Sequence, residues 1–164
     1  MVKDEAPAVQ PRGPKKQKQK QPVTPRKPYK VYKSADGIEI FVGRGARDND
    51  ELSISSAREC PREWWMHAAG CPGSHVVIKC DDDEPPRPTV LDAAALAAKY
   101  SKAAGNRVSV SLTRCRNVSK PRGAKPGLVN INGDVATIKL DMKSEADRLG
   151  RLEATLAGGA EPGE

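Results

Sequence analysis

Long hydrophobic runs are missing from this 164-residue sequence. No apolar segment approaches the ~18–20 residues that a transmembrane helix needs, which excludes a membrane-spanning protein. The first residues include Asp4 and Glu5 and hold no apolar stretch of the ~7–15 residues typical of a signal peptide. We therefore expect no intact secretory signal and no membrane partner.

Cysteine and histidine are also scarce, with four and two residues. The cysteines are not clustered, which excludes a disulfide scaffold and favours a reducing compartment. We expect the cytoplasm, or an organelle (plastid or mitochondrion) after removal of a transit peptide. The group Cys60, His67, Cys71, His75 and Cys80 lacks the paired C-x₂-C spacing of structural zinc, and no third residue is evident to orient a Cys/His nucleophile. We expect no metal, no cofactor and no enzymatic activity.

A nucleotide-binding glycine loop is incomplete. Gly43, Gly45 and Asp48 occupy the three positions where a dinucleotide fingerprint has glycine. A carboxylate at the third position would repel a pyrophosphate at the start of a helix. The pattern excludes a dinucleotide cofactor.

Acidic residues are absent from Ala93 to Gly133, although the whole chain carries 21 of them. The charged residues of that stretch are all basic: Lys99, Lys102, Arg107, Arg114, Arg116, Lys120, Arg122 and Lys125. The net charge is +7, and the Lys/Arg-rich residues 1–33 supply most of the excess, while acids gather at Asp81–Glu84. A cationic tail, together with a stretch whose charged residues are all basic, predicts a polyanion-binding surface.

Hydrophobic residues make up 37% of the chain, below the ~45–50% of a globular domain, so part of the chain stays outside the core. Residues 1–28 are rich in Pro, Lys and Gln without an amphipathic period, which predicts a disordered basic tail. We expect one domain over residues 29–143, then a short helix and an acidic disordered end over 144–164.

Strand patterns dominate the middle of the chain. Alternation predicts strands on either side of a turn at Ser34–Gly37, and further strands at 64–67, 74–80 and 107–112. A hairpin is expected around Asn132–Asp134, joining 128–131 to 135–140. The predicted helices are a short one at 46–51, a long one at 90–103 capped by Thr89, and an amphipathic one at 144–156. The class is mixed α/β (α+β), with a mainly antiparallel sheet and one long packed helix.

Two adjacent tryptophans lie on one predicted strand. Trp64 and Trp65 must face opposite sides of the sheet, so one belongs to the core and the other is partly exposed. An exposed tryptophan could stack on a base.

Several motifs, in order, resemble the NFACT-R (DUF814) family. The residues are Val42-Gly43-Arg44 with Asn49-Asp50, Glu63-Trp64-Trp65-Met66-His67, Cys71-Pro72-Gly73-Ser74-His75 before an apolar strand, Leu96–Ser101, and the basic loop Lys120–Gly127. The likeness runs from about Tyr29 to Leu140. It implies a stand-alone RNA-binding domain of the kind found in ribosome-associated quality-control factors, which bind the stalled large ribosomal subunit together with tRNA.

The resemblance and the charge pattern together give a set of expected site residues. We expect RNA contacts, to rRNA or tRNA, from Arg44, Trp65, His67, Ser74, His75, Arg107, Arg114, Arg116, Lys120, Arg122 and Lys125. Motif positions with a structural role are Gly43, Asn49, Asp50, Gly73 and Gly127. Whether His67 and His75 touch the ligand or only stabilise the fold is open at this stage.

Two readings of function remain. The first is a monomeric RNA-binding module that acts on the large ribosomal subunit, with DNA as another polyanion it could take. The second is a protein-binding adaptor whose basic tail alone touches nucleic acid. Deletion of the tail separates the two.

Overall fold

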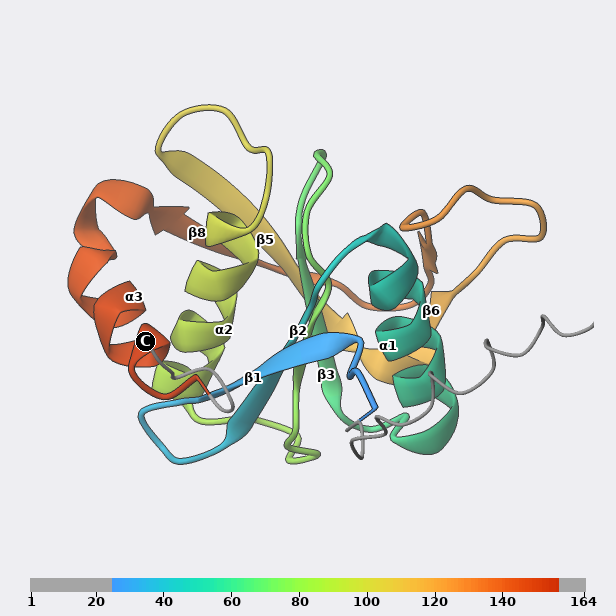
Figure 1. The fold of residues 1–164 in the computed structure, drawn as a ribbon, viewed down its shortest axis with the longest axis horizontal. Helices are drawn as coiled ribbons and strands as arrows, with labels where there is room; N and C mark the ends of the chain where they lie inside the picture. Colours follow the sequence, from blue (N-terminus) through green and yellow to red (C-terminus); the bar gives the residue numbers. More distant parts are fainter. Residues whose placement is uncertain (1–24, 157–164) are drawn as a thin grey trace, which may run out of the picture.

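The computed structural model describes residues 25–156. The predicted tail up to residue 24 and the end from residue 157 lie outside the described residues. Within these described residues, eight strands, three α-helices and two 3₁₀ helices follow one another. Figure 1 shows their arrangement. The elements are β1 (Tyr29–Lys33), β2 (Glu39–Gly43), α1 (Ala46–Glu59), β3 (Trp64–Ala68), β4 (Val76–Ile78), α2 (Arg87–Lys99), β5 (Arg107–Arg114), η3 (Cys115–Asn117), β6 (Val118–Ser119), β7 (Asn130–Ile131), β8 (Ala136–Asp141), η4 (Met142–Ser144) and α3 (Ala146–Glu153).

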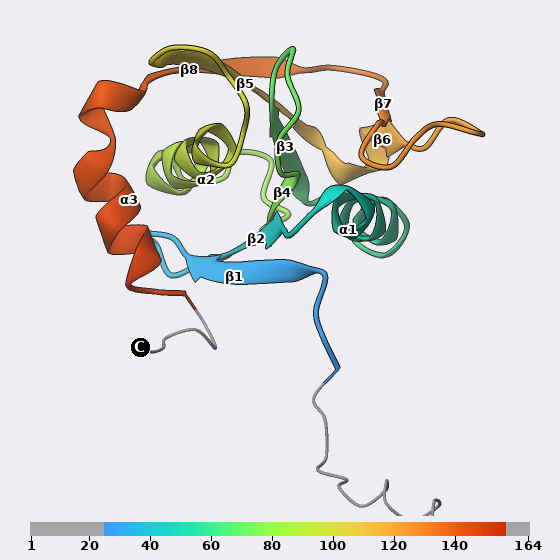
Figure 2. The same cartoon turned by 45° about the horizontal axis from the view of Figure 1, so that its top comes forward.

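A six-stranded sheet in the order β1-β2-β4-β3-β5-β8 forms the centre of the molecule. Every neighbouring pair in this sheet is antiparallel, as the sequence predicts. The sheet curves around α2, and α3 lies across the open side between β1 and β8 (Figure 2). The opposite face of the sheet carries α1 and the small β6–β7 pair.

Each face of the sheet has its own hydrophobic core. Ile40, Met66 and Val76 point toward the alanine-rich face of α2. On the other face, Trp65 and Val77 pack with Leu52 of α1. Because side chains alternate along a strand, the sheet separates the two cores. The prediction that Trp64 and Trp65 face opposite sides is confirmed: Trp65 is buried under α1, whereas the partly exposed Trp64 packs against the α2 core.

Helix α1 is much longer than the predicted 46–51. Its buried residues are Asn49, Leu52, Ser53 and Ser56, which share one face at helical spacing. Three of these four side chains are polar, so a hydrophobic pattern could not reveal the helix. The molecule therefore has two long helices, α1 and α2, where the sequence predicts one.

Helix α2 also begins and ends earlier than predicted. Its first residue, Arg87, follows Pro86, and the predicted cap Thr89 is buried inside the helix. The Thr89 hydroxyl bonds Ser34 Oγ at 2.7 Å and Asp36 Oδ2 at 2.8 Å, which ties α2 to the β1–β2 turn. Because the Thr89 hydroxyl is engaged in this tertiary contact, it does not cap the helix, which begins two residues earlier at Arg87.

The predicted hairpin over 128–140 is wrong. Strand β7 pairs with β6, and β8 pairs with β5 along its whole length. Asn132–Asp134 forms the turn between two different sheets. A turn signal in the sequence identifies a change of direction but not the partner of each strand.

Candidate functional site

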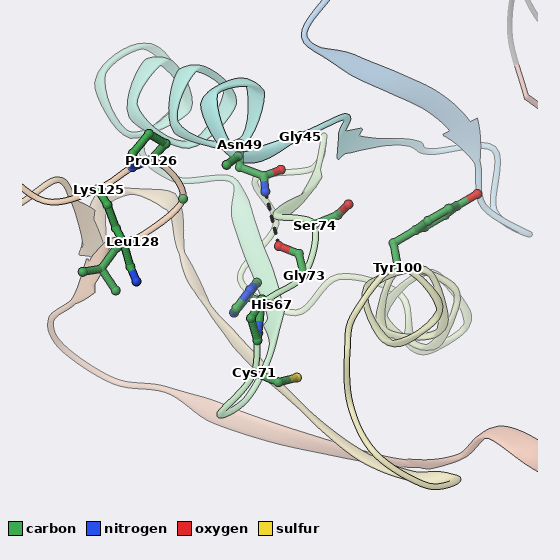
Figure 3. A pocket seen from close by; sticks show the side chains of 13 residues that line it. Gly45, Asn49, His67, Cys71, Gly73, Ser74, Tyr100, Lys125, Pro126 and Leu128 are labelled. Atoms are coloured by element: carbon green, nitrogen blue, oxygen red, sulfur yellow. Dashed lines mark hydrogen bonds between the residues drawn. The ribbon is translucent and has the colours of Figure 1, made fainter.

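A pocket of about 500 Å³ opens where β3 ends and β4 begins. Figure 3 shows how the connection between these strands forms its floor, with the start of α1, the end of α2 and the basic loop around it. We call it the central pocket, and its lining residues are Gly45, Ala46, Asn49, His67, Cys71, Pro72, Gly73, Ser74, Tyr100, Lys125, Pro126, Gly127 and Leu128. None of these described residues is acidic.

Asn49 fixes one wall of the pocket from inside α1. Its side-chain Nδ2 donates to Gly73 O at 3.2 Å, and its Oδ1 accepts from His75 N at 3.1 Å. A Cβ atom on Gly43 would lie 1.9 Å from Asn49 Oδ1, so only glycine fits there. A Cβ on Gly73 would lie 2.8 Å from Ser101 Cβ at the end of α2. The motif positions Gly43, Asn49 and Gly73 thus bring three elements together.

His75 is buried and connects the core to the basic loop. Its Nε2 lies 3.2 Å from Gly127 O, which can only accept, so Nε2 carries the proton and Nδ1 is an acceptor. Ser53 Oγ, 2.6 Å from Nδ1, donates to it and accepts from Trp65 Nε1 at 2.8 Å. Burial, followed by the neighbouring His67, lowers the pKa of His75 to about 4. His75 is therefore neutral at physiological pH, is only 1% exposed and positions the loop, so the structure supports the structural role that the sequence left open beside a ligand contact.

Gly127 is held from a second side. Its N–H donates to Asp50 Oδ1 at 3.1 Å, and its φ of +88° favours glycine. Lys120 Nζ bonds Asp50 Oδ2 at 3.0 Å and also donates to the carbonyl oxygens of Lys125 and Leu128. An ammonium group has three donors, so these three partners saturate it. Lys120 therefore clamps the loop through these three contacts, and its RNA contact stays a prediction.

His67 and Ser74 reach the pocket wall. His67 lies 5.1 Å from His75, ring centroid to ring centroid, in an edge contact. Burial lowers the pKa of His67, and a hydrogen bond with the Gly73 backbone acts in the opposite direction. The Ser74 hydroxyl donates to Gly43 O at 2.9 Å, so it braces the β2–α1 connection while it lines the pocket.

Residues from each of the sequence motifs thus meet at one pocket. In addition, the family model described as NFACT protein RNA binding domain matches residues 28–133. The chain belongs to the NFACT-R family. This confirms the resemblance that the sequence motifs predict.

Curated relatives of this NFACT-R chain include the Rqc2 homolog RqcH of Bacillus subtilis, 42% identical over 122 residues, or 73% of this chain and 20% of the relative. The Rqc2 homolog RqcH of Streptococcus pneumoniae is 38% identical over 120 residues, covering 72% of this chain and 21% of the relative. The chain spans about a fifth of these relatives. A solved structure of the C-terminal part of the fibronectin/fibrinogen-binding protein from Streptococcus suis superposes with a TM-score of 0.68 at 33% identity, covering 86% of this chain and 54% of that chain.

The cations of the acid-free stretch do not form the single patch that the sequence predicts. Arg107 and Arg114 stand at opposite ends of β5, roughly 23 Å apart at the usual rise of a strand. Arg114 stacks on Trp64, with its guanidinium 4.0 Å from the ring centroid, and pairs with Asp83 at 2.7 Å. Arg116 is exposed on this Trp64 side. None of these three lines the central pocket of the NFACT-R domain.

Three predicted cations surround the central pocket or its loop. Lys125 lines the pocket, and Arg122 is exposed at the turn of the same loop. Arg44 is exposed beside Gly45, and its Nε donates to Lys27 O at 3.0 Å. Their RNA contacts stay predictions.

Trp65 is not available for stacking on a base. It is only 1% exposed and donates its indole N–H to Ser53. Its position on the α1 face, where the sheet is covered, explains the difference from the expectation.

Sequence reasoning missed several residues of the site. Leu128 lines the pocket and is 51% exposed. Tyr100 lines the opposite wall, and the ammonium groups of Lys30 and Lys99 lie 4.1 and 5.3 Å from its ring centroid. Tyr100 was already part of a family motif, but only the fold brings Lys30 of β1 next to it.

Within residues 25–156 the side chains form no cluster of three or more His, Cys, Asp or Glu suited to a metal ion. All four cysteines are free thiols, and burial raises the pKa of Cys115 to about 12. In the same part of the chain, no helix has the length and apolar character to cross a membrane.

Proposed function

We propose that this NFACT-R domain is an RNA-binding module that uses the central pocket and the basic loop Lys120–Gly127. The main support is the convergence of the motif residues on one pocket whose described lining carries Lys125 and no carboxylate. The two acids that flank Asn49 in α1 are already neutralised, Asp50 by Lys120 at 3.0 Å and Asp48 by Arg26 at 2.8 Å. Such a surface favours a phosphate backbone.

The RNA partner that we propose is rRNA or tRNA on a large ribosomal subunit that carries an obstructed nascent chain. The support is membership of the NFACT-R family together with the relatives of the chain, which are Rqc2 homologs. Cosedimentation with purified large subunits tests this. The chain should pellet with subunits that hold peptidyl-tRNA, and equal recovery with vacant subunits would remove tRNA from the proposal.

The first prediction concerns the loop cations. The double change Arg122→Glu and Lys125→Glu should weaken RNA binding at least tenfold, because it replaces two phosphate-facing cations with carboxylates at the pocket. It should also lower the slope of log affinity against log salt by about 1.4, since each phosphate contact on a single strand contributes about 0.7. Fluorescence anisotropy with a labelled RNA over a salt series measures both.

A matched control uses two cations of the same stretch that lie away from the pocket. Arg107→Glu with Arg116→Glu makes the same charge change at two exposed positions. This control should change affinity less than threefold. Equal losses in the two double variants would mean that net charge, not this surface, determines binding.

A further inference from the structure

We propose that the central pocket receives one unstacked nucleobase, so that the domain prefers single-stranded or looped RNA over a duplex. This inference rests on the proposed function and adds the kind of RNA that the site takes. Its starting point is shape. Phosphate contacts alone need no concavity, whereas the pocket holds about 500 Å³, within the range of sites that enclose a small ligand.

The lining fits the faces and edges of a base. Leu128, Pro126 and Pro72 supply apolar surface, and Leu128 is one of two large hydrophobic side chains that are exposed among the described residues. An apolar side chain at a pocket rim beside Lys125 gives a packing surface for a base next to a partner for its phosphate. Single-stranded RNA is recognised in this way, by stacking or packing of splayed bases together with backbone contacts.

Polar groups complete the lining. His67 is neutral at physiological pH, because burial lowers its pKa. A neutral imidazole has one donor and one acceptor, so His67 in the pocket lining can serve a hydrogen-bonding group on a base edge. A charged imidazole would serve a phosphate instead, so a neutral one favours the base.

Charge on the far wall gives the strand a second contact. Tyr100 stands across the pocket from Lys125 (Figure 3), and the ammonium groups of Lys30 and Lys99 lie against its ring. Glu153 offsets Lys99 at 3.3 Å, which leaves Lys30 as the stronger cation on that side. A single strand of RNA can therefore bind with one phosphate at Lys125, the base of that nucleotide in the pocket, and the next phosphate near Lys30. A duplex cannot, because its bases stay stacked and paired.

The test uses the full chain and a 12-nucleotide RNA with 2-aminopurine at its centre, either single-stranded or annealed to its complement. Ala46→Leu fills the pocket mouth without changing charge, and Leu128→Ala removes the apolar rim. Ala146→Leu is the matched control, because Ala46 and Ala146 are both exposed first residues of helices. Circular dichroism verifies that each variant is folded.

We expect both pocket variants to weaken single-strand binding at least fivefold, to leave duplex binding within twofold, and to abolish the rise in 2-aminopurine fluorescence that marks unstacking. The control should bind like the unaltered chain. Equal effects on the two RNAs, or no effect on either, would overturn the nucleobase pocket. If the Arg122/Lys125 double variant still loses affinity, RNA binding at this surface stands without the pocket. If that variant also binds normally, the proposed function itself fails.

Discussion

At the scale of single residues, the side chains of the NFACT-R motifs act mainly through other groups. Asn49, Asp50 and His75 each hold backbone atoms of the pocket wall or of the basic loop. The Lys120 ammonium group donates to the Asp50 carboxylate and to two backbone carbonyl oxygens. These four motif residues of the chain thus position the pocket wall and its loop.

The structural role of His75 can be tested through the pH dependence of the free energy of unfolding. The unfolded chain binds a proton at His75 near pH 6.5, whereas the folded chain does so only near pH 4. Between these values the unfolded state holds more protons, so stability falls as the pH falls. At about 1.4 kcal/mol per pKa unit, the free energy of unfolding should drop about 2 kcal/mol more from pH 7 to 4.5 in the unaltered chain than in His75→Gln.

Urea unfolding at several pH values measures this difference. Burial also lowers the pKa of His67, so this group changes the stability in the same direction. The variant His67→Gln is therefore the control, and it should keep most of the pH dependence. Parallel profiles for His75→Gln and the unaltered chain would contradict the role assigned to His75.

At the scale of elements, α3 lies outside residues 28–133 and is held both by Leu152, which is buried in the α2 core, and by one buried carboxylate. Asp92 of α2 is fully buried and accepts from Arg148 at 2.7 Å and from Arg151 at 2.6 Å, as well as from Ala35 N at 2.8 Å. Burial alone would raise the pKa of Asp92, but its hydrogen bonds from Arg151, Ala35 and Arg148 lower it. The carboxylate therefore stays charged and keeps α3 across the open side of the sheet.

Asp92→Asn should loosen the attachment of α3. The change removes the counter-ion of Arg151 and one of the two carboxylate partners of Arg148, which keeps Glu145 at 2.7 Å. We expect a cost of about 2 kcal/mol, below the ~3–5 of a fully buried pair, because both arginines are partly exposed. Hydrogen exchange of the α3 amides should accelerate while that of β3 stays slow. Glu153→Gln breaks the exposed Lys99–Glu153 pair between the same helices and should cost no more than about 0.5 kcal/mol.

Some of the strands and helices could be predicted from the sequence, and others could not. The antiparallel strands and α2 follow from alternation and an alanine-rich run, which are local signals. The length of α1 was missed because its buried face is Asn49, Ser53 and Ser56 around Leu52. The partner of β8 was missed because pairing with β5 depends on residues far away in the sequence.

At the scale of the whole molecule, the charge pattern predicted a cationic surface but not its shape. Strand β5 carries Arg107 and Arg114 to opposite ends, and Asp83 and Asp50 neutralise Arg114 and Lys120. These pairings join segments that are distant in sequence, so no count of charges along the chain reveals them. The cationic group that remains around the pocket is smaller: Lys125 in its lining, Arg122 on the same loop, Arg44 beside Gly45, and Lys30 of β1 at the Tyr100 ring.

The start of the described chain is anchored beside that pocket. Arg26 makes two hydrogen bonds to Asp48 at 2.9 and 2.8 Å, in the first turn of α1. Residues 1–24, which carry six Lys/Arg and two acids, therefore join the domain next to the pocket rim. Positive charge attached at this place increases the rate of encounter with a polyanion, while the pocket determines which RNA stays bound.

Removing residues 1–24 should thus lower RNA affinity about tenfold at low salt, mostly through a slower association rate. The ratio of affinities for single-stranded and duplex RNA should not change, because that ratio belongs to the pocket. A full-length control in which Lys15, Lys16, Lys18 and Lys20 are all Gln should reproduce the loss and lower the salt slope by up to about 3, at about 0.7 per phosphate contact. Stopped-flow association kinetics over a salt series measures each quantity. If binding disappears entirely on deletion, the tail alone touches nucleic acid and the adaptor reading is correct, since a pocket that binds RNA retains part of the affinity without it.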